Sequence, residues 1–140
     1  MNLNDSILMK RFLFLALVGL SVAVLACDDC KIPKPAAGQR VVEYDLTIAE
    51  QTVNLAGKAV RAFTINGGIP GPTLRFREGD FARIRVHNRL KHETTSTHWH
   101  GLLLPNEQDG VPHVTTPPIQ PGTTHTFGFD LRHSGTYWYH

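Results

Sequence analysis

Beyond its first thirty residues the sequence contains no sulfur-bearing side chain. Cys27 and Cys30 are the only cysteines of the 140-residue chain, and Met1 and Met9 are the only methionines. Metal sites that combine a thiolate with a thioether ligand therefore have neither ligand available in the rest of the chain. Any metal held there must be bound by nitrogen or oxygen.

The chain also lacks a strong excess of charge. Its formal net charge is +2, and 19% of its residues are charged. The arginines at positions 75, 77, 83 and 85 alternate with other residues, as on the solvent face of strands, so we expect no nucleic-acid-binding surface. A hydrophobic content of 41% in a chain of this length fits one domain with a modest core.

No segment has a convincing helical period, and we find no internal repeat or low-complexity stretch. Alternating apolar and polar residues instead recur in short segments, separated by turn-forming pairs such as Asn66-Gly67 and Pro121-Gly122. We expect strands near residues 41–49, 59–66, 73–77, 81–88, 95–103, 125–130 and 136–140. Strands of this length and spacing predict an all-β sandwich or barrel.

The N-terminus has the pattern of a secretory signal peptide. Lys10 and Arg11 precede an apolar run that ends at Ala26, shorter than the about 20 residues of a transmembrane helix. We therefore assign residues 1–26 to a signal peptide and expect an exported, periplasmic protein. An uncleaved membrane anchor is the alternative.

Residues 24–27, Val-Leu-Ala-Cys, resemble the lipobox of bacterial lipoproteins. This resemblance implies that Cys27 becomes lipidated and attaches the protein to a membrane, and Asp28 resembles an inner-membrane retention signal. The alternative is ordinary cleavage after Ala26, which leaves Cys27 and Cys30 free, bridged or metal-bound. Pro33 and its neighbours form a linker over residues 27–39, and the folded domain is expected over residues 40–140.

Two histidine-bearing segments carry the strongest chemical signal. Because side chains alternate along a strand, His98 and His100 should project from one face about 7 Å apart, with Trp99 on the other face. By the same rule Trp138 and His140 share a face. Imidazoles suit copper and zinc, so the pattern predicts a metal site on a β-sheet.

Five motifs together resemble a known family. They occur in order at residues 65–73, 78–80, 98–101, 109–112 and 135–140. The set resembles the first cupredoxin domain of a multicopper oxidase, most of all the bacterial copper-resistance oxidases. The resemblance implies a cupredoxin-like Greek-key β-sandwich over residues 40–140.

The resemblance also implies roles for individual residues. His98 matches the ligand of a type 2 copper, and His100 and His140 match ligands of the two type 3 coppers. Asp109 matches an acid that helps deliver protons to oxygen. In the family this cluster is completed by other domains, and it reduces O₂ with electrons from phenols or metal ions. A type 1 copper site, which needs cysteine, is not expected in this chain.

The family motif continues with Ser-His beyond the position of His140. We therefore expect the sequence to be the N-terminal part of a longer oxidase, with a fold incomplete at its C-terminus and no oxidase turnover by itself. Its partners would then be the remaining cupredoxin domains or partner subunits. Two alternatives stay open: a membrane-tethered copper-binding module without catalysis, and a zinc hydrolase that uses the His-x-His pair and a bound water.

Overall fold

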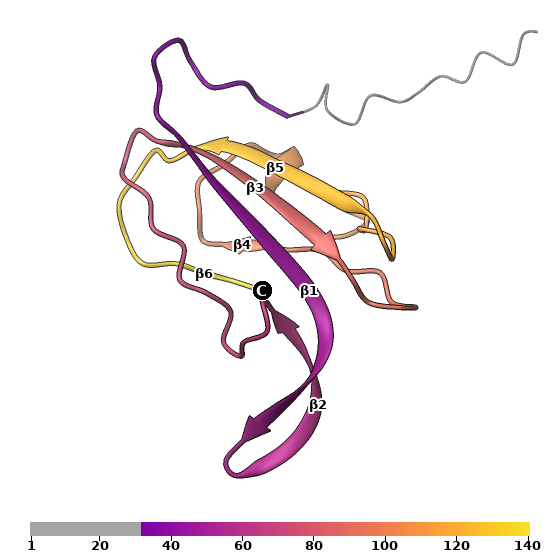
Figure 1. The fold of residues 1–140 in the computed structure, drawn as a ribbon. Helices are drawn as coiled ribbons and strands as arrows, with labels where there is room; N and C mark the ends of the chain where they lie inside the picture. Colours follow the sequence, from indigo (N-terminus) through magenta and orange to yellow (C-terminus); the bar gives the residue numbers. More distant parts are fainter. Residues whose placement is uncertain (1–31) are drawn as a thin grey trace, which may run out of the picture.

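The computed structural model describes residues 32–140, and these residues form two β layers (Figure 1). The strands are β1 (Val41–Leu55), β2 (Lys58–Ile65), β3 (Phe81–Asn88), β4 (Trp99–His100), β5 (Thr124–Asp130) and β6 (Trp138–Tyr139). The one helical element of the described residues is the 3-10 turn η2 (Asn106–Gln108). The expectation of short strands without α-helices is confirmed for this part of the chain.

Residues 1–31 lie outside the described residues. The predicted signal peptide, the lipidation of Cys27 and the first part of the linker fall in that range and stay predictions. Among residues 32–140, no helix is long and apolar enough to cross a membrane.

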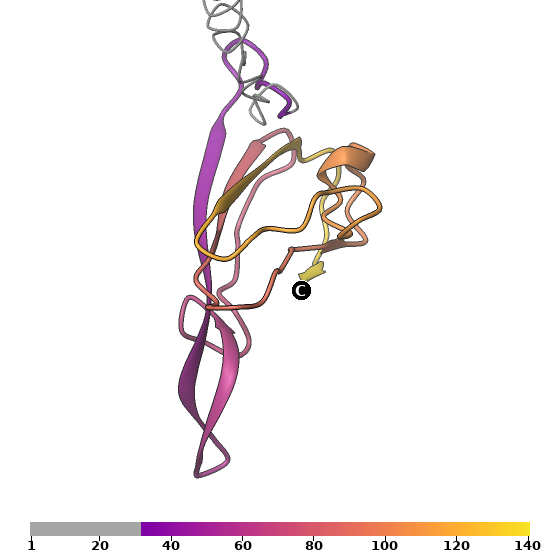
Figure 2. The same cartoon turned by 90° about the vertical axis from the view of Figure 1, so that its right-hand side faces the viewer.

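The larger sheet has the strand order β2-β1-β3-β5. The two central strands, β1 and β3, run parallel, while β2 and β5 are antiparallel to their neighbours. The second sheet consists of β4 and β6, paired antiparallel. Figure 2 shows the larger sheet nearly edge-on, with the C-terminal end of the chain and η2 lying to one side of it.

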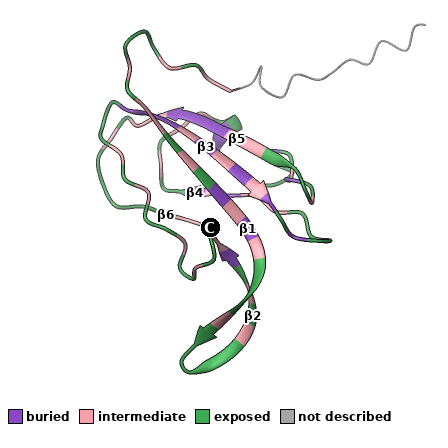
Figure 3. Ribbon diagram, in the orientation of Figure 1, coloured by how far each residue is buried: buried purple, intermediate pink, exposed green. Residues whose placement is uncertain are grey.

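The inner face of the larger sheet forms the core. In β3, Ile84 and Val86 are fully buried and alternate with partly exposed residues, as a strand period of two requires. Phe127 and Phe129 of β5 complete this apolar surface. The outer half of the β1–β2 hairpin, in contrast, is largely exposed and extends beyond the core (Figure 3).

The outer face of the same sheet carries a row of charged side chains. Arg85 of β3 contacts the Asp45 carboxylate of β1 at 2.7 and 2.8 Å, and Glu43 at 3.1 Å. Hydrogen bonds from Arg85 hold the pKa of Asp45 well below its usual range. The positive charge of Arg83 is offset in the same way, by Glu43 at 2.8 Å. These arginines lie on the outward face, as predicted, and are paired with acids of the neighbouring strand.

Three expected strands are wrong or only partly present: residues 73–77 form none, and residues 95–103 and 136–140 contain only the two-residue strands β4 and β6. Residues 73–77 are not part of a ladder: both backbone groups of Arg75 bond the Tyr44 hydroxyl, whose oxygen accepts from the Arg75 N–H at 2.9 Å and donates to its carbonyl at 3.2 Å. Pro70 and Pro72 precede this segment and offer no N–H for pairing. Within residues 95–103, only Trp99 and His100 form a strand, and Thr95 makes an isolated bridge to Ile119.

A buried carboxylate joins the start of the domain to the turn before β3. Asp80 accepts hydrogen bonds from the Arg40 side chain at 2.8 and 2.9 Å and from the Arg77 N–H at 2.7 Å. These donors, led by Arg40, lower the pKa of Asp80 from 3.8 to about 2. Asp80 therefore stabilises the fold fully above its ordinary pKa, and this contribution is lost as the pH falls through about 2.

We predict that Asp80→Asn lowers the free energy of unfolding at neutral pH, because asparagine cannot accept all three charge-assisted bonds. The difference from the wild type should shrink between about pH 4 and pH 2, where the wild-type carboxylate becomes protonated. Urea unfolding across that range measures it. The control is Glu50→Gln, which breaks an exposed pair with Arg61 and should change stability little. A pH-independent loss in Asp80→Asn would contradict the assignment.

Candidate metal centre

The short β4–β6 ladder brings the two histidine segments side by side. Trp99 pairs with Tyr139 and His100 with Trp138. The pairing continues one residue further, since the His98 N–H donates to the His140 carbonyl at 2.8 Å and the His140 N–H donates to the His98 carbonyl at 3.2 Å. Backbone hydrogen bonds alone thus fix the spacing of the two segments.

The inward-facing aromatic residues anchor this ladder to the core. Trp99 is only 2% exposed, and its ring lies 5.3 Å from Phe127 and 5.6 Å from Phe129 between centroids. Tyr139 packs beside Trp99 and donates a hydrogen bond from its hydroxyl to the Pro72 carbonyl at 2.7 Å. Burial raises the pKa of Tyr139, which keeps this donor protonated. Because these residues face the core, their neighbours in sequence must face away from it.

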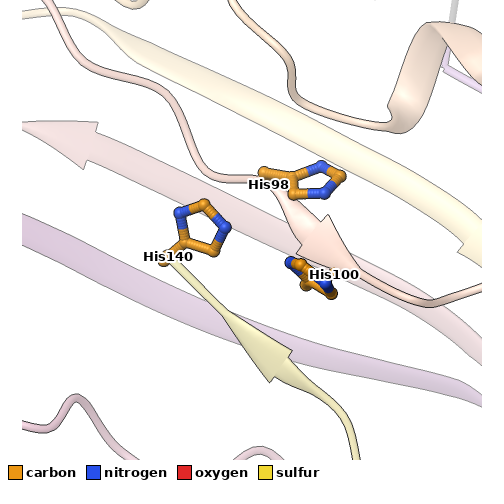
Figure 4. A group of neighbouring side chains, drawn as sticks. All are labelled: His98, His100 and His140. Atoms are coloured by element: carbon orange, nitrogen blue, oxygen red, sulfur yellow. The ribbon is translucent and has the colours of Figure 1, made fainter.

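Three imidazoles converge on that opposite face. One ligand atom from each of His98, His100 and His140 lies within 4.8 Å of the others. Figure 4 shows the three rings around a common space, two from β4 and its approach and one from the end of the chain. In residues 32–140 this is the only such group of three histidines, cysteines or acids. The predicted sharing of one face by His98 and His100 is confirmed, with ring centroids 5.5 Å apart.

The backbone of Asp109 sets the orientation of one ring. The Nδ1–H of His98 donates to the Asp109 carbonyl at 2.8 Å, and the Asp109 carboxylate lies 3.4 Å from the same nitrogen. A carbonyl only accepts, so Nδ1 carries the proton and the Nε2 lone pair is free for a metal. The site fits a metal that prefers imidazole, because its three potential ligands are all nitrogen donors.

Gly110 allows the Asp109 loop to lie against the histidine strand. Its φ is +78°, and a Cβ at this position would collide with the Thr97 carbonyl oxygen. The loop is held there from both sides: Ser96 donates to the Gly110 carbonyl at 2.6 Å, and the Gly110 N–H donates to the Thr116 hydroxyl at 3.1 Å. The sequence alone does not indicate this close approach.

The predicted site residues of the described region thus lie together. His98, His100, His140 and Asp109 share one site, whereas Cys27 falls outside the described residues. His113, which follows the Asp109 loop, is an exposed turn residue with a φ of +65°. It does not belong to the histidine group.

A family model for multicopper oxidases matches residues 47–140. The chain belongs to the multicopper oxidase family. A copper resistance protein A homolog of Pseudomonas syringae pv. tomato is 52% identical over 111 residues, which cover 78% of this chain and 19% of that relative. Copper resistance protein A of Escherichia coli is 49% identical over 105 residues, 75% of this chain and 17% of that relative.

Solved multicopper oxidase structures share the fold. The multicopper oxidase from Pseudomonas thermotolerans superposes with a TM-score of 0.68 at 39% identity, over 73% of this chain and 25% of that one. A laccase from Botrytis aclada gives 0.70 at 40% identity, over 81% and 21%. The expected all-β, cupredoxin-like fold is confirmed. This multicopper oxidase chain spans less than a fifth of the length of its copper-resistance relatives.

We predict that Gly110→Ala disrupts the site. The added methyl group collides with the Thr97 backbone, and alanine at positive φ costs a further about 1–2 kcal/mol. The total loss of unfolding free energy should exceed that figure, and the loop should move away from His98. Urea unfolding measures the stability change.

Gly57→Ala is the matched control. Gly57 has a φ of +83° but nothing within 4 Å of its virtual Cβ, so this variant carries the backbone cost without the collision. Equal losses in the two variants would show that the approach of Gly110 to Thr97 does not matter.

Proposed function

We propose that this chain supplies part of a copper cluster in a multicopper oxidase. This proposal rests on the convergence of His98, His100 and His140. The His98 ring is already in the tautomer that metal binding requires. In this proposal His98 binds a type 2 copper, and His100 and His140 each bind a type 3 copper. Copper resistance and laccase relatives support copper as the metal.

The remaining ligands must come from elsewhere in this proposal. Two of the three imidazoles, His100 and His140, belong to exposed residues, so the site opens toward solvent. Three nitrogen ligands are too few for three copper ions. We therefore propose that further cupredoxin domains or partner subunits cover this face and complete the cluster. When bound, such a cluster supplies the electrons that reduce O₂ to water, drawn from a phenol or metal-ion substrate.

The protein's own residues would orient the ligands and handle protons. The Asp109 carbonyl keeps the proton of His98 on Nδ1, which directs Nε2 toward the metal. The Asp109 carboxylate is partly exposed and lies 3.4 Å from His98 Nδ1, where it would take up protons from water for delivery toward the site. The backbone and side chain of Asp109 therefore have separate roles, which substitution can distinguish.

We predict that the full chain binds Cu²⁺ more tightly than Zn²⁺, as the usual affinity order requires. Replacing His98 and His100 by alanine should lower copper affinity by more than the about 10–100-fold typical of losing an outer-shell partner, because direct ligands are removed. Isothermal titration of both proteins with each metal measures the affinities.

His92→Ala is the control, since it removes an exposed imidazole outside the group. Equal copper binding by the wild type and the double variant would remove these histidines from the site. A preference for zinc would favour the hydrolase alternative.

We predict that Asp109→Asn, in a complete oxidase carrying this domain, slows reoxidation of the reduced enzyme by O₂ by about 10²-fold. Asparagine keeps the backbone carbonyl that orients His98 but cannot carry the proton. Copper content should therefore stay unchanged. Stopped-flow reoxidation measures the rate, with Glu107→Gln as a control at an exposed acid of the preceding turn. A wild-type rate in Asp109→Asn would leave the residue with a structural role alone.

A further inference from the structure

The three imidazoles of the site are not held in the same way. His98 has a hydrogen-bond acceptor for its second ring nitrogen, the Asp109 carbonyl. Within residues 32–140, neither ring nitrogen of His100 or His140 has a hydrogen-bond partner. Histidines that bind metals almost always have such a partner, because it fixes the orientation of the ring. Something else must orient these two rings.

Trp138 contacts both of them. It is the cross-strand partner of His100 and stands two residues before His140, so the strand period puts its indole on the face of both rings. The indole stacks on His140 with centroids 4.5 Å apart and an interplanar angle of 29°. It lies 4.8 Å from the His100 ring at 31°. One side chain therefore restricts the rotation of two ligands.

Packing of the core does not account for Trp138. The other tryptophan, Trp99, is 2% exposed and lies among core aromatics, whereas Trp138 is 59% exposed. Tyr137 is also exposed, but its ring packs on His133, 5.1 Å away, and belongs to the opposite face of the strand. Within the described residues, the ring contacts of the exposed Trp138 indole are with the two imidazoles, whose arrangement it therefore restricts.

We propose that Trp138 is the positioning residue for His100 and His140, replacing by ring stacking the hydrogen bond that orients His98. This inference rests on the proposed copper-binding role of the histidines. It assigns different supports to the ligands: a carbonyl for the type 2 ligand and a shared indole for the two type 3 ligands. Loss of the indole frees both type 3 ligands together and leaves His98 in place.

The test uses three variants of the full chain, with Cu²⁺ as the titrant. Trp138→Leu keeps an apolar side chain but removes the planar ring, and it should lower copper affinity by about tenfold, in the range found for outer-shell partners. Trp138→Phe keeps a ring that can stack and should restore most of that affinity. Tyr137→Leu, on the neighbouring exposed aromatic residue, should bind copper as the wild type does.

Imidazole NMR signals of the metal-free protein give a second measurement that does not depend on copper. The ring protons of His100 and His140 should shift in Trp138→Leu as the indole ring current disappears, while those of His98 stay near their wild-type positions. Unchanged signals of His100 and His140 would overturn the proposal. So would wild-type copper affinity in Trp138→Leu, an equal loss in Tyr137→Leu, or no rescue by Trp138→Phe.

The histidine variants distinguish the positioning role of Trp138 from the proposed copper-binding function. If His98→Ala with His100→Ala abolishes copper binding but Trp138→Leu does not weaken it, the positioning role fails and the proposed function stands. If the wild type itself binds no copper, the proposed function fails, and the positioning role fails with it.

Discussion

The candidate metal centre depends on one pair of backbone hydrogen bonds, those exchanged by His98 and His140. They join two segments that are far apart in the sequence. They also fix the register that places the His140 imidazole beside those of His98 and His100. The β4–β6 ladder alone is only two residues long on each strand, too short to be stable without support. Its support is the packing of Trp99 and Tyr139 on the core, so core packing and ligand geometry are coupled through alternate residues.

Much of this fold could be predicted from the sequence because side-chain alternation is a local property. The alternation in residues 81–88 predicted a strand, and β3 occupies those same residues. Residues 73–77 were also predicted to form a strand, but they do not form one. Their alternating pattern suits a strand, but a strand also needs a backbone partner, and the Tyr44 hydroxyl occupies the backbone groups of Arg75 instead. Which group satisfies a backbone donor is decided by tertiary structure.

The candidate site, too, could be predicted from the sequence only in part. Alternation predicted that His98 and His100 share a face and that Trp138 lies with His140, and both arrangements are present. The family resemblance suggested Asp109 through its carboxylate, whereas its closest contact with His98 is through the backbone carbonyl. Neither that contact nor the tight approach of Gly110 has a signature in the sequence, because both depend on how a distant loop meets the strand. The assignment of the histidines to copper stays a prediction.

The long first strand has a consequence for how this fold tolerates change. Ile48 is the one residue of β1 that belongs to both ladders, since it pairs with Asn88 of β3 and with Ile65 of β2. Before this junction, inserting a single residue would turn the buried side chains outward along the core. Beyond it, the hairpin can gain or lose residues in matched pairs while the register of the core stays intact. The hairpin end of β1 can therefore change in length without shifting the register that β1 shares with β3.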